Sequence, residues 1–538
     1  MKICLISPPT TVADRHAHYP QVPPIGVAYL AACARKAGHE VQIIDALGEA
    51  LDAYHPFLRG QWINGLNIDE VVRRVDRDAA LIGVSVMFSK QWPLARRLIA
   101  ALREAFPTMP IVAGGEHPTA SPDHVFATAP VDYVVLGEGE ETLLELAAAL
   151  TLPETPDVSH IEGLAYRAAR PGVRRAANGD INLALIDQES GTAIRRTAAR
   201  QRRRDLDSIP WPAWDLIPTA KYVDANRFQD GSVRRVMILL GTRGCPYQCR
   251  FCSNPQMWTT SFYMRDPKDL IDEMEHYVRE YGASEFQFQD LTFVVNRRWV
   301  IRVAEEIIQR KLDVVWKLPG GTRSEAFDAE LMEKLAASGC RALCFAPESG
   351  SKYVLEAMLK KADPDRFVEL GRIVRRNRIP IEMTAFIIIG SPEERLRDLL
   401  ITYWFVMRLA FVGYEGVMVS RFTCYPGSDY HDQYMKKGLI SYDDNYFLDL
   451  DLSLSNLKHG RSWHPRWGSK KVRWFVMLAY ALFFATFYAS RPMRVLRSIV
   501  HVLRRRPTSR LELVISHAMA ARWQRVANLF RRPMATAG

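Results

Sequence analysis

The chain has 538 residues, of which 48% are hydrophobic and 24% are charged. These values exclude a disordered chain and a single small domain, and they predict two or three folded domains with ample core. The opening residues, MKICLISPPTT, hold an apolar run that is too short for a secretion signal. We therefore expect a cytoplasmic, reducing environment, in which clustered cysteines are metal ligands or redox centres before they are disulfides.

The net charge of +11 is concentrated at the C-terminal end. From Arg461 onward there are 16 lysine or arginine residues and one acidic residue, Glu512, so the rest of the chain carries −4. This pattern describes a basic appendage on a near-neutral body rather than a nucleic-acid-binding core. We expect no nucleic acid partner, because no recognisable RNA-binding module accompanies the tail.

Residues 1–150 alternate short, apolar, β-branched strand patterns with helical patterns. The predicted strands cover 2–7, 39–45, 80–86, 110–115 and 131–137, with helices such as 25–38 and 93–106 between them. Runs this apolar predict a doubly wound parallel sheet with helices on both faces, which binds ligands at the carboxyl ends of its strands. Four loops there, 8–11, 85–89, 114–122 and 137–142, favour a binding face, although each loop alone is also explained by chain turning.

Residues 151–231 are predicted to be a linker and connector. The basic run at 195–207 is interpreted as solvated surface, and the aromatic, proline-broken stretch at 209–218 as a connector that packs on another element. A second α/β block covers 232–440, with strands predicted at 235–240, 285–289, 313–317, 342–346, 382–388 and 415–420. About six strand–helix units predict a partial (β/α)6 barrel of the TIM type, with its active site at the carboxyl ends of the strands.

Residues 441–538 are predicted to form a basic, aromatic-rich, mostly helical C-terminal region. The stretch 474–489 has 16 residues without a charge, which is short of the 18 or more that argue for a membrane span. Two interpretations stay open for it and for the basic run 491–507 that follows. It is either a buried helix, or an amphipathic element that makes peripheral contact with anionic lipid or lines the entry of an apolar substrate.

Three of the eight cysteines, Cys245, Cys249 and Cys252, lie on one loop directly after the first strand of the second block. Three thiolates spaced C-x3-C-x2-C suit an iron–sulfur cluster or zinc. Structural zinc sites usually need four ligands, and the next histidine, His276, lies inside a predicted helix. A 4Fe–4S cluster with three protein ligands leaves one iron free for another molecule.

This loop resembles the signature of radical S-adenosylmethionine (SAM) enzymes, which has an aromatic residue before the last cysteine, here Phe251. The resemblance implies a cluster whose free iron chelates SAM, and a 5′-deoxyadenosyl radical that abstracts hydrogen. Segments FQFQDLTF (286–293), TRSEAF (322–327), FAPESGS (345–351) and FIIIGSPEE (386–394) resemble the supporting motifs of this family. They imply SAM contacts at Phe251, Gln289, Asp290, Arg323, Glu348, Ser349 and Gly390. Asp290 has a second interpretation as a turn cap, and SPEE lacks the second glycine that is common at the adenine-contact segment.

The N-terminal half resembles the cobalamin-binding domain fused to one subclass of these enzymes. The resemblance rests on PPIGVAYLAACARKAGHEVQIIDA (23–46), GGEHPT (114–119), GEGEET (137–142) and the connector PWPAWDLIP (210–218). It implies cobalamin contacts at Pro9, Thr10, Gly26, Ser85, Met87, Gly114, Gly115, Glu116, His117, Gly137, Glu138 and Gly139. There is no D-x-H-x-x-G motif, which favours base-off cobalamin without a protein histidine on cobalt; His117 is either an axial ligand or a loop histidine held by hydrogen bonds.

The resemblance implies three cofactors: a 4Fe–4S cluster, SAM and cobalamin. It further implies a methyltransferase that moves a methyl group from SAM through methylcobalamin to an unactivated carbon or phosphorus centre of a small, apolar or anionic metabolite. The alternative keeps both cofactors but uses the radical for oxidative cyclisation or ring rearrangement. An external low-potential electron donor of the flavodoxin or ferredoxin type is expected, and no catalytic side chain is assigned.

Overall fold

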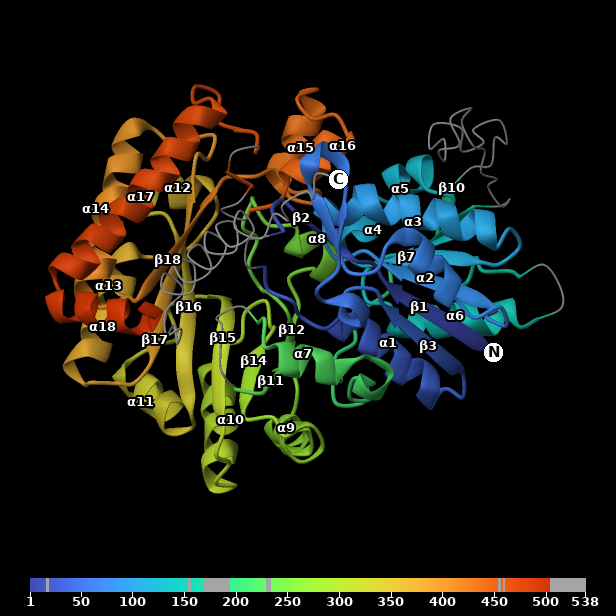
Figure 1. The fold of residues 1–538 in the computed structure, drawn as a ribbon, viewed down its shortest axis with the longest axis horizontal. Coiled ribbons are helices and arrows are strands. Elements are labelled where there is room, and N and C mark those ends of the chain that lie inside the picture. The colour runs from blue at the N-terminus through green and yellow to red at the C-terminus, as the bar shows by residue number, and fades with distance from the viewer. Residues whose placement is uncertain are drawn as a thin grey trace, which may run out of the picture.

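A computed structural model describes residues 1–15, 19–152, 156–167, 194–228, 234–452, 456–457 and 460–503. Part of the predicted linker and the tail from 504 onward therefore lie outside the described residues. The described chain forms two mainly parallel sheets with flanking helices that lie next to each other, and the helix Ser469–Ala489 covers the second (Figure 1). This confirms the predicted fold class: a doubly wound sheet, a partial barrel and a helical C-terminal region.

The first sheet has the strand order β10-β9-β8-β7-β6-β1-β3. Its parallel strands are β1 (Lys2–Ser7), β3 (Glu40–Asp45), β6 (Leu81–Ser85), β7 (Ile111–Gly114) and β8 (Tyr133–Val135). Alternate residues of β1 enter two cores, Cys4 and Ile6 on one face and Ile3 and Leu5 on the other. The covering helices are α1 (Ile25–Lys36), α2 (Ile68–Arg74), α3 (Trp92–Ala105), α4 (Glu116–Ala120), α5 (Pro122–Thr128) and α6 (Glu140–Leu150).

Several short strands of this region were not predicted. The sheet ends with two antiparallel strands, β9 (Leu164–Arg167) and β10 (Ile194–Arg196), and a separate antiparallel sheet joins β2 (Thr10–Val12), β5 (Trp62–Asn64) and β4 (Tyr54–Pro56). Strands of three or four residues are too short to show an alternation pattern in the sequence.

The second sheet is parallel throughout, in the order β11-β14-β15-β16-β17-β18. Its strands are β11 (Val236–Leu239), β14 (Glu285–Phe288), β15 (Val315–Thr322), β16 (Cys340–Glu348), β17 (Glu382–Ile389) and β18 (Gly416–Arg421). Among the described residues β18 does not pair with β11, so the barrel is open. The outer helices are α9 (Pro267–Tyr281), α10 (Arg297–Gln309), α11 (Ala329–Ala337), α12 (Lys352–Ala357), α13 (Pro364–Arg376) and α14 (Leu396–Val412).

The connector between the two sheets packs on both. Tyr222 of α7 (Thr219–Ala225) is buried and its hydroxyl donates to Asp45 Oδ2 at 2.8 Å, at the end of β3. The basic run at 195–207 is the predicted solvated surface only in part: Arg195, Arg196 and Arg204 are exposed. Arg200, Arg202 and Arg203 instead pair with glutamates of the loop after β8 and of helix α6.

The C-terminal region completes both domains. Helices α15 (Asp429–Lys436) and α16 (Asp444–Asp449) lie over the first domain, where Arg97 Nη2 pairs with Asp444 Oδ2 at 2.8 Å. Helix α17 (Ser469–Ala489) packs on α14 and β18 and is followed by α18 (Pro492–Leu503). The buried stripe of α17 consists of Val472, Val476, Ala479, Phe483 and Phe487, which belong to the barrel core.

Candidate functional site for two cofactors

The three clustered cysteines lie where the sequence predicts, on the loop between β12 (Thr242–Gly244) and α8 (Asn254–Trp258). All three are half-buried free thiols, whereas the other five cysteines are buried in the cores. Gly244, directly before Cys245, has φ +92°, and a Cβ there would lie 2.1 Å from the Ser261 carbonyl oxygen. Only glycine fits this close approach, which lets the chain leave β12 into the loop.

Three thiols on one loop suit a 4Fe–4S cluster, which binds each thiolate at a different iron. Among the described residues no three His, Cys, Asp or Glu side chains form the ligand group of a single metal ion. Burial raises the pKa of the Cys252 thiol to about 12, so ionisation there depends on a bound metal.

Two buried basic side chains lie near the cysteines, and one of them, Arg323, was predicted from the sequence. Arg323, after β15, is buried, lies 3.8 Å over the ring of Tyr247, and pairs with Glu325 Oε1 at 2.6 Å. Lys360 was not predicted; its Nζ lies 3.1 Å from Glu348 Oε1, and both side chains are buried. Burial raises the pKa of Cys249, and the charges of Lys360 and Arg323 lower it.

Unpaired polar atoms gather at the carboxyl ends of β14 and β15. Gln289 has a buried Nε2 that finds no partner among the described residues. The same holds for the hydroxyls of Thr292, Thr322 and Ser324. Buried polar groups are normally hydrogen-bonded, so this set fits a polar ligand such as the methionine part of SAM.

Asp290 does not belong to this set. Its carboxylate accepts hydrogen bonds from the amide of Thr242 at 2.5 Å, the Thr242 hydroxyl and the amide of Gly241. Burial raises its pKa to about 6, and these hydrogen bonds oppose the rise. Asp290 therefore holds the chain between β11 and β12, which fits its alternative interpretation as a turn cap, and its contact with SAM stays a prediction.

The remaining predicted SAM residues lie in different surroundings. Glu348 ends β16 at φ +64°, beside Lys360. Ser349 turns toward α14, where its hydroxyl lies 3.0 Å from Thr402 Oγ1, so it does not face the cysteines. Phe251 packs against a core shared with residues 422–463. Gly390, at φ +88°, follows β17 and lies against Val472; its adenine contact stays a prediction.

The predicted cobalamin residues gather at one edge of the first sheet, because β1, β6, β7 and β8 are parallel and end there. Met87 and Phe88, after β6, expose 41% and 56% of their surfaces, and Phe88 was not predicted. An exposed apolar pair at this edge fits the face of a corrin ring. The residues that follow these strand ends are Pro9, Thr10, Ser85, Met87, Gly114, Gly115, Gly137 and Gly139.

Other predicted cobalamin residues are engaged elsewhere. Gly26 is exposed, and a Cβ there would meet nothing within 4 Å, so no close approach requires its glycine. Glu116 accepts a hydrogen bond from the hydroxyl of Ser253, and Glu138 pairs with Arg202 and Arg243. The carboxylates of both glutamates therefore contact the barrel domain or the connector. Asn254 was also missed: it is buried, and neither atom of its amide has a partner in the described chain.

His117 is fully buried, which favours its interpretation as a histidine held by hydrogen bonds. Its Nδ1 lies 3.1 Å from Ser89 Oγ, and its ring lies 4.8 Å from that of Trp92 and 5.3 Å from that of Phe447. Burial holds its pKa well below the ordinary value. The ring is enclosed among Ser89, Trp92 and Phe447, as expected for a histidine held by a hydrogen bond, and its contact with cobalamin stays a prediction.

Comparison with family models gives two matches. Residues 16–147 match the B12 binding domain, and residues 239–403 match the Radical SAM superfamily. Together the two segments make up more than half of the chain. They correspond to the first sheet and to the barrel strands that surround the cysteine loop.

Three relatives align over most of the chain. An uncharacterized methyltransferase of Pyrococcus horikoshii is 28% identical over 80% of this chain and 82% of its own length. The cytidylyl-2-hydroxyethylphosphonate methyltransferase of Streptomyces wedmorensis is 27% identical over 83% and 84%. The anaerobic magnesium-protoporphyrin IX monomethyl ester cyclase of Cereibacter sphaeroides is 29% identical over 71% of this chain and 56% of its own.

A solved structure shares the fold. The radical SAM methyltransferase TsrM from Kitasatospora setae, with cobalamin and a [4Fe-4S] cluster bound, superposes with a TM-score of 0.59 at 18% identity, over 81% of this chain and 78% of that one. A B12-binding domain precedes a radical SAM domain in this chain, with three free cysteines on the loop after the first barrel strand. On these grounds the chain belongs to the cobalamin-dependent radical S-adenosylmethionine enzymes.

Proposed function

We propose that this protein is a methyltransferase that moves a methyl group from SAM, by way of cobalamin, to an unactivated carbon or phosphorus centre of a small or lipophilic metabolite. The observation that carries the proposal is the contact between the two binding edges. The loops after β7 and β8 contact the cysteine loop through Glu116–Ser253 and Glu138–Arg243. Two cofactors held on these loops would lie close enough to act on one substrate. Two of the three relatives named above are methyltransferases.

Different residues are assigned to the cluster and to SAM. Cys245, Cys249 and Cys252 hold the cluster and leave one iron for SAM. Arg323 and Lys360 are the buried cations beside these thiols, and both suit the methionine carboxylate. When bound, the cluster supplies the electron that cleaves SAM and cobalamin carries the methyl group. The chain itself orients these groups and excludes water.

A second candidate function is oxidative cyclisation or ring rearrangement without net methyl transfer. The specific observation in its favour is the relative from Cereibacter sphaeroides, which is named a cyclase and aligns over both domains. The chain covers 56% of that relative's length. Both candidates use the same three cofactors and the same external low-potential electron donor of the flavodoxin or ferredoxin type.

The test uses protein purified without oxygen, loaded with iron, sulfide and cobalamin, and supplied with SAM and a low-potential reductant. We expect both S-adenosylhomocysteine and 5′-deoxyadenosine by mass spectrometry, with the first product dependent on cobalamin. Formation of 5′-deoxyadenosine without cobalamin-dependent S-adenosylhomocysteine contradicts the methyltransferase and favours the cobalamin-dependent cyclase. The substrate search then starts from apolar and anionic metabolites.

We also propose that α14 and α17 dock on an anionic membrane surface. In the described chain α17 is the one helix long and apolar enough to cross a membrane, but one stripe of it is buried in the barrel core. The opposite stripe is exposed, and Trp474 there is 71% exposed. Trp404 of the adjacent α14 is 62% exposed. The other exposed apolar residues of this pair are Leu396, Leu400, Ile401, Phe411, Met477 and Leu478.

Charge favours an anionic lipid as the occupant of this surface. The sequences of α14 and α17 contain five lysine or arginine residues and one acidic residue, Asp398, which is buried. A pocket of about 500 Å³ beside Trp404 is lined by Arg395, Arg397 and Arg408, of which Arg395 pairs with Asp398 and Arg408 with Asp365. Exposed indole rings with nearby basic side chains are the arrangement that binds membrane interfaces.

Vesicle sedimentation tests this surface. The full chain should sediment with phosphatidylglycerol vesicles, much less with phosphatidylcholine vesicles, and lose binding in high salt. Replacing Trp404→Glu together with Trp474→Glu should lower the bound fraction about tenfold or more, because both an apolar anchor is lost and a negative charge is added. Leu152→Glu, at a position 63% exposed on the first domain, is the matched control. Equal sedimentation of the double variant contradicts the proposal.

A further inference from the structure

Both ends of the cysteine loop are tied to the cobalamin-binding domain by glutamates. Arg243 stands two residues before Cys245, and its guanidinium reaches Glu138 Oε1 at 3.1 Å and Glu140 Oε1 at 2.7 Å. Ser253 directly follows Cys252, and its hydroxyl donates to Glu116. Glu116 and Glu138 follow β7 and β8, so the ties reach two different loops of the first domain.

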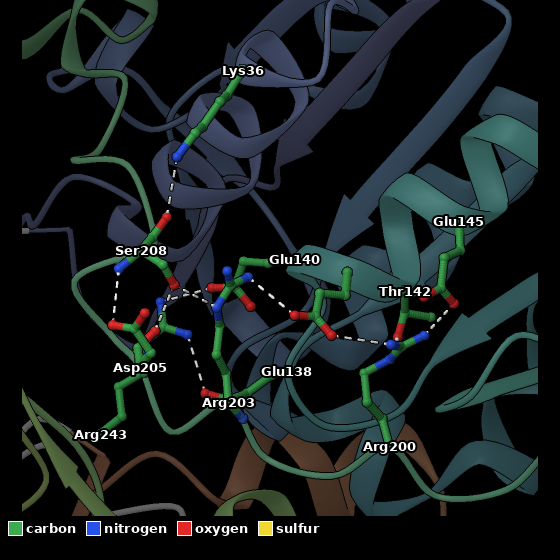
Figure 2. Close-up of polar contacts among 11 residues, drawn as sticks. Lys36, Glu138, Glu140, Thr142, Glu145, Arg200, Arg203, Asp205, Ser208 and Arg243 are labelled. Carbon is green, nitrogen blue, oxygen red and sulfur yellow. Dashed lines mark hydrogen bonds and ion pairs between the residues drawn. The ribbon is translucent and has the colours of Figure 1, made fainter.

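The tie at Arg243 is buried within a larger network (Figure 2). Glu138 also accepts from Arg202 Nε at 3.1 Å and from the Arg203 amide at 3.2 Å. Arg202 in turn donates to the carbonyl of Trp258, just beyond the cysteine loop, at 2.6 Å. The side chains of Arg243 and Glu138 are 9% and 10% exposed. A buried pair with this many partners has few alternative geometries.

The tie at Ser253 is closely packed on the other side of the loop. The Glu116 carboxyl is shielded from solvent, and burial raises its pKa. A Cβ at Gly427 would lie 3.4 Å from Ser253 Cβ and 3.0 Å from Ala120 Cβ of α4. The segment at Gly427 therefore covers the junction between α4 and the start of α8. The cysteine loop is fixed at both ends and has little freedom to shift alone.

We infer that Glu116 and Glu138 are positioning residues that fix the cluster loop relative to the cobalamin-binding loops, acting through Ser253 and Arg243. The inference rests on the proposed function, in which the methyl group and the radical carbon act on one substrate atom. Placement matters because a displacement of roughly 1 Å in a reacting pair costs on the order of 100-fold in rate. Both carboxylates were predicted from the sequence to contact cobalamin, and the experiment separates these two roles.

The first measurement needs no cofactor. Hydrogen exchange of the full chain, followed by mass spectrometry, reports the opening of the segment 241–254. Glu138→Gln, Arg243→Gln and Ser253→Ala should each speed exchange there about tenfold, since each removes a hydrogen bond to a charged group. Glu145→Gln is the matched control, because Glu145 pairs with Arg200 in the same network but lies 44% exposed and does not touch the loop. Unchanged exchange in all three variants overturns the inference.

The second measurement uses the loaded enzyme and the ratio of S-adenosylhomocysteine to 5′-deoxyadenosine. Loss of alignment should lower this ratio about tenfold or more in Glu138→Gln and Arg243→Gln. The double variant Glu138→Gln/Arg243→Gln should lose less than the sum of the two single losses, because the residues share one contact while Arg243 also pairs with Glu140 and Glu138 with Arg202. Fully additive losses would mean that the Glu138–Arg243 contact contributes nothing, and would overturn the positioning role of Glu138.

Failure of the proposed function gives a different result from failure of this inference. If the unaltered enzyme makes no cobalamin-dependent S-adenosylhomocysteine, the methyltransferase proposal fails. The exchange measurement still shows whether the two glutamates hold the cysteine loop. Ser253→Ala keeps the inference testable if a glutamine variant does not fold, because it removes a single hydroxyl. Faster exchange at 241–254 in Ser253→Ala supports the tie, and unchanged exchange overturns its Glu116 arm.

Discussion

Alanine in place of Cys245, Cys249 or Cys252 is expected to abolish the iron–sulfur cluster. Each thiolate binds one iron, and two remaining ligands on a half-buried loop do not retain a cluster that needs three. Iron and sulfide content after anaerobic reconstitution should fall close to zero, together with the brown absorbance. Formation of 5′-deoxyadenosine should fall by about a thousandfold or more, since cleavage of SAM has no other electron source in the site.

The matched control is Cys33→Ala, because Cys33 lies in helix α1 of the first domain, away from the loop. Burial raises the pKa of its thiol to about 11, which leaves it unreactive and unavailable to iron at neutral pH. This variant should keep the full cluster. A Cys252→Ala protein that keeps both the cluster and SAM cleavage would show that the ligand assignment is wrong.

Removal of the two buried cations beside the cluster loop is expected to weaken SAM binding strongly. Arg323→Met and Lys360→Met each delete a charge-assisted contact suited to the methionine carboxylate, which corresponds to roughly 1.5–3 kcal/mol. The dissociation constant of SAM should therefore rise about 10- to 150-fold in each variant. Equilibrium binding to the cluster-loaded protein measures this, with iron content as the check that the cluster itself is intact.

Lys352→Met is the control for the lysine, because Lys352 begins the helix α12 that precedes Lys360 but is 70% exposed, with its Nζ 3.7 Å from Asp363 Oδ1. Its SAM affinity should be unchanged. If Lys360→Met also bound SAM normally, Lys360 would serve only to neutralise Glu348, and the carboxylate would be assigned to Arg323 alone.

The architecture could be predicted from the sequence because its long strands are buried on both faces. Predicted ranges such as 382–388 and 235–240 correspond to β17 (Glu382–Ile389) and β11 (Val236–Leu239) within about two residues. An apolar run bounded by glycine or proline has few other interpretations. The strands that were missed, β2, β4, β5, β9, β10, β12 and β13 (Phe262–Met264), are antiparallel strands of three or four residues, and their pairing depends on tertiary contacts rather than on local pattern.

The site was predicted less completely, for reasons that differ by residue. Lys360 follows helix α12, which ends at Ala357, and Leu359 at φ +51° turns the chain so that Lys360 reaches Glu348; no motif in the sequence marks this turn. Glu138 was assigned to the cobalamin-binding loops and Arg202 to a solvated basic run, and the two assignments were made separately. No local signal states that one is the partner of the other.

The packing of α17 on β18 and α14 has a consequence for synthesis of the protein. Phe483 and Phe487 complete the barrel core, yet they follow the last barrel strand by a long stretch of chain. At translation rates of about 5–20 residues per second, the outer face of β18 and α14 stays uncovered for roughly 4–15 s after α14 has left the ribosome. Nascent chains in this interval present an apolar surface to chaperones. A message truncated before the codon for Phe483 yields a barrel whose apolar surface on β18 and α14 stays uncovered.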